Sequence, residues 1–211
     1  MLELIGAIIV SYLVGGIPTS IIAGRLLKGI DIREHGSGNA GATNVYRVLG
    51  PVPGIVVILI DAGKGVLSVL LFAQFVPPDI INDAAGIQII CGFTAILGHS
   101  FPVWAGFRGG KGIGTGAGVL FSIIPLISAI AVSIFIIAVA LTKYISLGSM
   151  LATISVSLML LIEKYFLGKD TSPILLYVCI VLTIFVLFSH KANIKRILNG
   201  TENRFGKSVK I

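Results

Sequence analysis

Long apolar runs separated by short polar segments dominate the pattern of this 211-residue chain. A run of about 20 apolar residues is long enough to cross the hydrocarbon core of a bilayer as a helix. The apolar runs cover residues 4–27, 51–76, 84–98, 113–141, 149–162 and 173–188. Pro18 interrupts the first of them and predicts a bend there. The pattern therefore predicts an all-α integral membrane protein that forms a single domain over residues 1–211.

Basic residues between the runs predict the orientation, because short loops rich in Lys and Arg stay on the cytoplasmic side. The turn at 77–83 carries only Asp79 and Asp83 as charged residues, and we expect it outside. Three segments carry the positive charge and are expected inside: 28–50, 99–112 and 191–211. Lys207 and Lys210 in the tail belong to this topology signal. The N-terminus is therefore predicted outside and the C-terminus in the cytoplasm.

The stretch 113–141 decides the number of crossings. A cytoplasmic tail requires it to cross twice, with a break near Ser122–Pro125. Two passes leave about 14 residues for each, which is short of the usual ~20. We nevertheless expect two passes, and hence a bundle of about seven transmembrane helices with the polar motif loops on the cytoplasmic face.

Composition supports a membrane protein and narrows the kinds of partner. The chain is 55% hydrophobic and 12% charged, whereas a soluble domain is about 25% charged. Its net charge of +7 is compatible with nucleic acid, an anionic membrane surface or anionic substrates. No stretch combines basic and aromatic residues as nucleic-acid binding requires, so we expect no nucleic acid. Cys91 and Cys179 lie inside apolar runs without metal-ligand spacing, and no metal site is predicted.

The first polar motif is Ser37-Gly38-Asn39-Ala40-Gly41-Ala42-Thr43-Asn44, followed by Arg47. Its small residues let backbone approach a ligand closely, and its Ser, Asn and Thr side chains offer uncharged hydrogen bonds. Arg47 can grip two phosphate oxygens at once. The motif fits a phosphate site and, equally, an ordinary loop that caps the next helix.

The second motif runs from Gly98-His99-Ser100-Phe101-Pro102 to Phe107-Arg108-Gly109-Gly110-Lys111-Gly112. Successive glycines can point backbone N–H groups into an anion nest, to which Lys111 adds a charge. Because Gly112 follows Lys111 in place of Ser or Thr, this is no Walker A loop and implies no nucleotide. The alternative is a plain glycine-rich turn between spans, with His99 as a structural hydrogen-bonding group.

A third motif begins where the last apolar run ends. Its polar residues are His190, Asn193, Lys195, Arg196, Glu202 and Arg204. A spacing of three places His190 and Asn193 on one helix face. Asp61 and Lys64 have the same spacing inside an apolar run, where charged residues are candidates for function or for a structural pair. Ser149 opens another run on the same membrane face and is weak as a signal by itself.

The three motifs together resemble the PlsY family of bacterial acyl-phosphate:glycerol-3-phosphate acyltransferases. The resemblance rests on SGNAGATN, GHSFPVWAGFRGGKG and HKANIKRILNGTENRF, in order and over essentially the whole chain, with DAGKG and KYISLGS as further similar segments. It implies transfer of a fatty acyl group from acyl phosphate to the 1-hydroxyl of sn-glycerol 3-phosphate. The products are 1-acylglycerol 3-phosphate (lysophosphatidate) and inorganic phosphate, in the first acylation of phospholipid biosynthesis. No cofactor is implied, and the location is the bacterial inner membrane.

The resemblance also implies roles for individual residues. The glycine loop with Gly109, Gly110, Lys111 and Gly112 would hold the acyl phosphate. The glycerol 3-phosphate site would contain Arg47, Lys111, Ser149, His190 and Asn193, with Ser37, Asn39 and Asn44 completing the pocket. The candidates for a catalytic role are Ser37, Asn39, Arg47, Lys111, His190 and Asn193, and Thr43 and His99 are further candidates for substrate binding. A substrate phosphate could itself take the hydroxyl proton, and His190 as general base is the rival mechanism. The enzyme that forms acyl phosphate is a candidate partner.

Two other functions fit a basic membrane protein. A transporter of small anions or organophosphates places its polar groups near the midplane, in two related halves. Here they lie mainly in loops at one face, and no internal repeat is visible. A noncatalytic scaffold would not need the glycine-rich segment together with Arg47. The HxxxxD signature of other glycerolipid acyltransferases is missing, because the residues five after His35, His99 and His190 are Ala40, Trp104 and Lys195.

Overall fold

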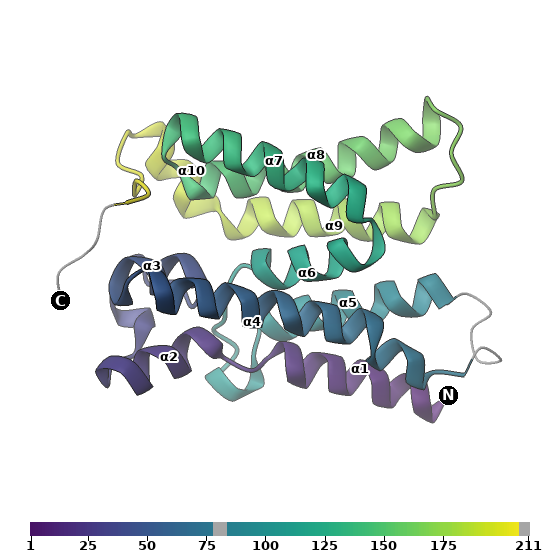
Figure 1. Cartoon of the computed structure of the whole chain (residues 1–211), viewed down its shortest axis with the longest axis horizontal. Helices are drawn as coiled ribbons and strands as arrows, with labels where there is room; N and C mark the ends of the chain where they lie inside the picture. Colours follow the sequence, from purple (N-terminus) through teal and green to yellow (C-terminus); the bar gives the residue numbers. More distant parts are fainter. Residues whose placement is uncertain (78–83, 207–211) are drawn as a thin grey trace. The chain divides into compact units, whose positions relative to one another are not determined.

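A computed structural model describes residues 1–77 and 84–206, and within them every regular element is a helix (Figure 1). The chain divides into two compact units, of which the first covers residues 1–123 and the second begins at Ile124. The expectations for Asp79, Asp83, Lys207 and Lys210 lie outside the described residues. That residues 1–211 form a single domain stays a prediction.

The first unit carries helices α1 to α6 and three short 3₁₀ helices. Their bounds are α1 Leu2–Gly15, α2 Thr19–Lys28, η1 Ile32–Glu34, α3 Ala42–Leu49, α4 Pro51–Leu70, η2 Phe72–Phe75, α5 Ala84–Ser100, η3 Val103–Ala105 and α6 Ile113–Ile123. Helix α4 packs against α3, α5 and α6, and α1 packs against α5. The predicted bend at Pro18 is confirmed as the break between α1 and α2.

The second unit is built from four helices. Their bounds are α7 Pro125–Thr142, α8 Ile145–Tyr165, α9 Pro173–Ser189 and α10 Lys191–Leu198. Helix α8 packs against both α7 and α9 (Figure 1). Prolines start α7 and α9 because the first turn of a helix tolerates a residue without an N–H donor.

Within residues 1–77 and 84–206, five helical segments are long and apolar enough to cross a membrane by length and composition. They are Leu2–Lys28, Pro51–Phe75, Ala84–Ala105, Pro125–Thr142 and Ile145–Tyr165. The pair formed by α9 and α10, bent by 56°, raises the number to six if it counts as one span.

All six apolar runs that the sequence shows form helices, and the break expected near Ser122–Pro125 occurs at Ile124. Helix α6 has only 11 residues, which at about 1.5 Å per residue falls well short of a ~30 Å hydrocarbon core. The expected two passes of residues 113–141 are thus one full-length helix and one short one.

Two segments are more helical than predicted. The polar loop expected at 28–50 contains α3, because Val45 and Val48 form a buried apolar face there. Helix α8 begins at Ile145 instead of 149, directly after Lys143 adopts a left-handed conformation with φ of 63°. In both cases one buried side of the segment outweighs its polar composition.

Candidate functional site

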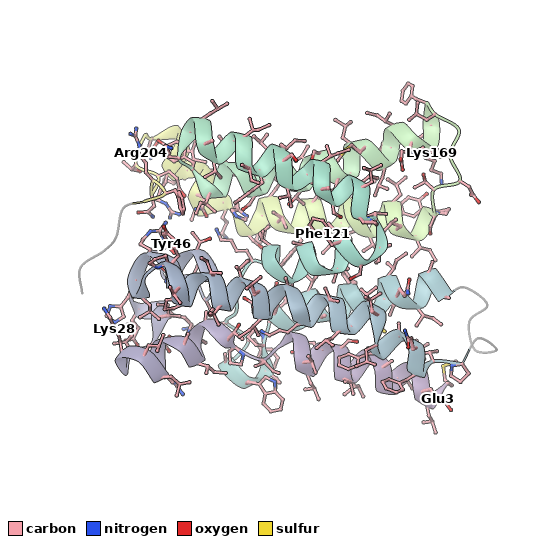
Figure 2. All side chains as sticks on the ribbon, in the orientation of Figure 1. Glu3, Lys28, Tyr46, Phe121, Lys169 and Arg204 are labelled. Atoms are coloured by element: carbon pink, nitrogen blue, oxygen red, sulfur yellow. The ribbon has the colours of Figure 1, made fainter. Side chains whose placement is uncertain are left out.

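Polar motif residues mark one end of each unit. In the first unit, Lys28 and Tyr46 lie at the end opposite Glu3 (Figure 2). In the second unit, Arg204 lies at the end opposite Lys169 (Figure 2). The first motif lies between Lys28 and Tyr46 in sequence and the third motif extends to Arg204, so each belongs to the polar end of its own unit.

The side chain of Asn44 makes hydrogen bonds that hold the loop of the first motif together. Its side chain is 1% exposed, and its Oδ1 accepts a hydrogen bond from the Ser37 N–H at 2.8 Å. Its Nδ2 donates to the carbonyls of Ile32 and His35, both at 2.9 Å. Both N–H donors of the amide are thereby used within the loop. Asn44 therefore holds the loop together, and its predicted role in substrate binding stays a prediction.

The other predicted residues of the first motif are more accessible. Ser37 is exposed, and Asn39, Thr43 and Arg47 are half-buried. Thr43 and Arg47 are four residues apart on α3 and therefore share a face, opposite to the buried Val45 and Val48. This face, together with Ser37 and Asn39, is the part of the motif that can reach a ligand.

An ion pair that the sequence did not single out ties the segment before the first motif to the second motif. Arg33 donates to both carboxylate oxygens of Asp31, with Nη2 at 2.7 Å from Oδ2, and its Nη1 donates to the Ala105 carbonyl at 2.9 Å. The hydrogen bonds from Arg33 lower the pKa of Asp31 to about 2. The pair thus holds η1 against η3, and neither residue has a spacing that would reveal this contact in advance.

The glycines of the second motif fit tightly against the end of α5. The Gly109 N–H donates to the Ser100 carbonyl at 3.2 Å and the Gly110 N–H to the His99 carbonyl at 3.1 Å. A Cβ on Gly110 would lie 2.1 Å from Nε2 of His99, and one on Gly109 would lie 2.1 Å from the His99 carbonyl oxygen. The expectation that these two N–H groups point into an anion nest is therefore wrong, because α5 already accepts both hydrogen bonds.

Lys111 and the start of α6 are the other parts of this motif with the chemistry to bind an anion. Lys111 is half-buried and two residues ahead of Ile113, where α6 begins. Gly112 has a φ of 77°, a backbone conformation that glycine adopts at no steric cost. The first N–H groups of a helix have no partner within it and carry positive partial charge. A lysine beside such a terminus can hold a phosphate.

Asp61 and Lys64 form a buried ion pair on α4, as their spacing predicts. Lys64 Nζ lies 2.7 Å from Asp61 Oδ1, and the two side chains are 4% and 2% exposed. Thr19 Oγ1 donates to the same carboxylate oxygen at 2.5 Å, and Lys64 also donates to the Ile17 carbonyl at 2.6 Å. A single charged residue at the centre of a membrane helix costs about 2.5–3.5 kcal/mol on insertion scales. The ion pair and its hydrogen bonds offset this cost for Asp61 and Lys64.

The third motif starts at the bend between α9 and α10. His190 lies at that bend and is 2% exposed, and Asn193 on α10 is 8% exposed. His190 Nδ1 lies 2.8 Å from the Val186 carbonyl oxygen, one turn earlier on α9. Both predicted residues are therefore buried within the second unit.

Glu202 is the acceptor around which this motif folds. Its Oε1 accepts from Asn193 Nδ2 at 2.7 Å and from Ser146 Oγ at 2.8 Å, and its Oε2 accepts from Arg196 Nε at 2.7 Å. Burial by itself raises the pKa of Glu202, but the hydrogen bonds from Asn193, Arg196 and Ser146 outweigh it, and the pKa is lowered. Sequence reasoning placed Glu202 among the polar residues of the motif without a role, because Ser146 is 56 residues away.

Ser149 lies one turn after Ser146 on α8. It is 5% exposed, and its Oγ donates to the Ile145 carbonyl at 3.0 Å. This back-bond within the helix satisfies the hydroxyl donor. A substrate contact through Ser149 would therefore use its oxygen as an acceptor.

Comparison with protein families gives one clear match. Residues 5–200 match the family described as Glycerol-3-phosphate acyltransferase. Among curated proteins, the glycerol-3-phosphate acyltransferase of Chlorobaculum parvum is 45% identical, with 98% of this chain and 99% of the relative covered. That of Pelodictyon phaeoclathratiforme is 43% identical, with the same coverage.

Two solved structures have the same fold. One is a crystal structure of PlsY, an integral membrane glycerol 3-phosphate acyltransferase, in its lysophosphatidic acid form; the TM-score is 0.81 at 33% identity, over 96% of this chain and 95% of the other. The other is the glycerol 3-phosphate form, with a TM-score of 0.79 at 31% identity, over 96% of each chain.

Proposed function

The chain belongs to the PlsY family of glycerol-3-phosphate acyltransferases, and from this we propose that its acyl donor is an acyl phosphate. The 1-hydroxyl oxygen of sn-glycerol 3-phosphate attacks the acyl carbonyl carbon, and the carbon–oxygen bond to the phosphate breaks. The hydroxyl proton passes to a base, and the products are lysophosphatidate and inorganic phosphate. The coarser activity, acyl transfer to glycerol 3-phosphate, is that of the family.

Lys111 beside the N-terminus of α6 is the observation that carries the proposal. In an acyl phosphate the dianion is one atom from the reacting carbon, so a group that binds the phosphate also positions the carbonyl. Negative charge grows on the phosphate as it departs, and Lys111 with the first N–H groups of α6 would stabilise it. A thioester would give these groups no phosphate at that place.

The remaining roles are proposed residue by residue. Arg47, with Ser37, Asn39 and Thr43, presents hydrogen-bond donors in the first unit for a phosphate ester. His190 and Asn193 in the second unit contribute to recognition of glycerol 3-phosphate, and Ser149 can accept a hydrogen bond from one of its hydroxyls. Asn44, His99, Gly109 and Gly110 shape the motifs from within. Two candidates take the hydroxyl proton, a substrate phosphate and His190.

The reaction fits a bacterial inner-membrane enzyme with its N-terminus outside and its C-terminus in the cytoplasm. Glycerol 3-phosphate is a soluble anion, whereas an acyl phosphate can keep its chain in the bilayer while its headgroup reaches Lys111 and the start of α6. We also propose the enzyme that produces acyl phosphate as a partner, because such a donor is reactive and sparingly soluble in water.

Donor specificity tests the proposal directly. Purified protein receives acyl phosphate, acyl-CoA or acyl carrier protein at matched acyl length, and lysophosphatidate is measured. We expect product from acyl phosphate alone, and a loss of about 10²–10³-fold in Lys111→Ala with unchanged thermal stability. Lys195→Ala removes an exposed cation from α10 and serves as the control. Comparable use of acyl-CoA, or near-normal turnover in Lys111→Ala, would contradict the assigned role of Lys111.

A further inference from the structure

Asp61 is the hub of a buried polar group in the first unit. Its Oδ1 accepts hydrogen bonds from Thr19 Oγ1 at 2.5 Å and Lys64 Nζ at 2.7 Å, and it lies 3.6 Å from His99 Nδ1. Lys64 and Thr19 together tie α4 to the break between α1 and α2. Their hydrogen bonds to Asp61 therefore have a structural purpose. The approach of His99 has no such explanation, because α5 already packs along α1 and α4.

His99 anchors the glycine loop, residues 109–112, to the end of α5. Its carbonyl accepts the Gly110 N–H, and its ring occupies the space where a Cβ of Gly110 would be. Thr19, His99, Gly109 and Gly110 also line one small pocket. The position of the His99 ring therefore sets how closely the glycine loop can approach the end of α5.

The helix that follows the glycine loop also passes close to Asp61. A Cβ on Gly114, in the first turn of α6, would lie 3.3 Å from Cβ of Asp61. Helix α6 packs on α4 backbone to backbone, since a Cβ on Gly118 would lie 2.0 Å from the Ala62 carbonyl oxygen. Small residues at a spacing of four allow such close packing of helices in membranes. Asp61 thus lies beside His99, whose carbonyl accepts the Gly110 N–H, and beside the first turn of α6.

We propose that Asp61, held by Lys64 and Thr19, is a positioning residue that fixes the glycine loop and Lys111 for binding the phosphate of the acyl donor. The inference rests on the proposed function, because it takes the loop as the donor site. Asp61 touches no substrate itself. It acts through His99 on one side of the loop and through the first turn of α6 on the other.

Two variants separate positioning from simple stability. Asp61→Asn combined with Lys64→Met removes both charges and leaves no unpaired ammonium in the interior. Thr19→Val keeps the size of the side chain and the ion pair but removes the hydroxyl that donates to Asp61. In purified protein we expect the double variant to raise the KM for acyl phosphate by about tenfold or more, with the KM for glycerol 3-phosphate changed by less than about twofold. Thr19→Val should also raise the KM for acyl phosphate, by a smaller factor.

Inorganic phosphate is the binding probe that does not depend on turnover. It should raise the thermal midpoint of the wild type clearly and that of the double variant much less. Ser157→Ala, which breaks the hydrogen bond between Ser157 and Thr183 in the second unit, is the matched control for loss of a buried polar contact. It should lower the thermal midpoint and leave both the phosphate response and the KM for acyl phosphate unchanged.

The outcomes are distinguishable. The inference is overturned if Asp61→Asn/Lys64→Met and Thr19→Val both keep the kinetic constants and the phosphate response of the wild type. Asp61 would then have a purely structural role. Equal increases in both KM values also overturn it, because they indicate a general loss of order. If the wild type makes no lysophosphatidate from acyl phosphate, the proposed function fails, and the inference as stated for the acyl donor fails with it. A normal wild-type reaction with unchanged variants removes the inference alone.

Discussion

Asn193 on α10 donates from Nδ2 to Oε1 of Glu202 at 2.7 Å. The same oxygen accepts the hydroxyl of Ser146, which lies in the first turn of α8. One carboxylate therefore joins the start of α8 to the segment that follows α10. Because an ionised carboxylate only accepts hydrogen bonds, the orientation of the Asn193 amide is fixed with its carbonyl oxygen directed away from Glu202.

The first prediction concerns Glu202 and pH. Its pKa is lowered from the ordinary 4.5, so the folded protein is stabilised by its ionised form at pH values above about 4.5. That contribution is lost as the pH falls through the lower folded-state pKa. At pH 7, Glu202→Gln should destabilise the protein by about 1–3 kcal/mol, and the difference from wild type should shrink below pH 4.5.

Thermal midpoints of the two proteins in detergent, followed from pH 7 to pH 3, measure this. Glu34 is exposed, and Glu34→Gln should show no comparable difference at any pH. A gap between wild type and Glu202→Gln that stays constant down to pH 3 would argue that lost packing, not charge, explains the effect.

The second prediction uses two glycines on one helix. A Cβ on Gly65 of α4 would lie 2.3 Å from the Thr115 carbonyl oxygen of α6, whereas one on Gly63 would meet nothing within 4 Å. Gly65→Ala must therefore push α6 away from α4, at a cost of about 1–3 kcal/mol or more, while Gly63→Ala should be tolerated. Thermal midpoints and turnover of both variants decide it, and equal behaviour of the pair would refute the close packing of α4 on α6.

Several features of this fold can be predicted from the sequence because they depend on the pattern of residues close together in the chain. Apolar length predicts the helices, Pro18 and Pro125 mark breaks, and the spacing of Asp61 and Lys64 predicts their ion pair. Each of these depends on neighbours within a few residues. Recognition of the family likewise rests on short motifs in a fixed order.

Contacts between distant segments could not be predicted in the same way. The N–H groups of Gly109 and Gly110 were expected to face a ligand, but α5 happens to end where its last carbonyls accept them. Glu202 meets Ser146 only because α8 and α10 come together in three dimensions. Asn44 gave no sign of facing inward, since a polar residue in a glycine-rich loop is usually solvated.

The third prediction tests the orientation. With a cytoplasmic tail after the last run, Lys169 in the segment after α8 is predicted on the external side of the membrane. Ser208 in the tail is predicted on the cytoplasmic side, and it is not among the residues that the structure describes. Single cysteines at these positions should label differently in intact cells. An impermeant maleimide should modify Lys169→Cys directly and Ser208→Cys only after permeabilisation. Because the native Cys91 and Cys179 are buried, they should contribute little background. The reverse labelling pattern would invert the topology.

The last prediction concerns the base. The Val186 carbonyl oxygen 2.8 Å from His190 Nδ1 can only accept, so Nδ1 carries the proton and Nε2 of the neutral ring is an acceptor. This tautomer suits a group that orients the hydroxyl of glycerol 3-phosphate, and it would equally suit a general base. The two roles differ in how kcat depends on pH. The low-pH limb of the kcat profile reports the group that must be deprotonated in the enzyme–substrate complex.

If a substrate phosphate takes the proton, His190→Gln should lower kcat by about 10–100-fold and keep the low-pH limb, because a phosphate monoester still titrates near pH ~6. Glutamine can orient a hydroxyl but cannot titrate, which makes the comparison specific. Full pH profiles of kcat for the wild type and His190→Gln provide the measurement, with Lys191→Ala as the control at a neighbouring exposed position on α10. A loss near 10⁴-fold together with disappearance of the low-pH limb would identify His190 as the base. We expect the limb to remain, because a donor that brings its own leaving group and its own phosphate needs orientation from the protein more than it needs a proton acceptor.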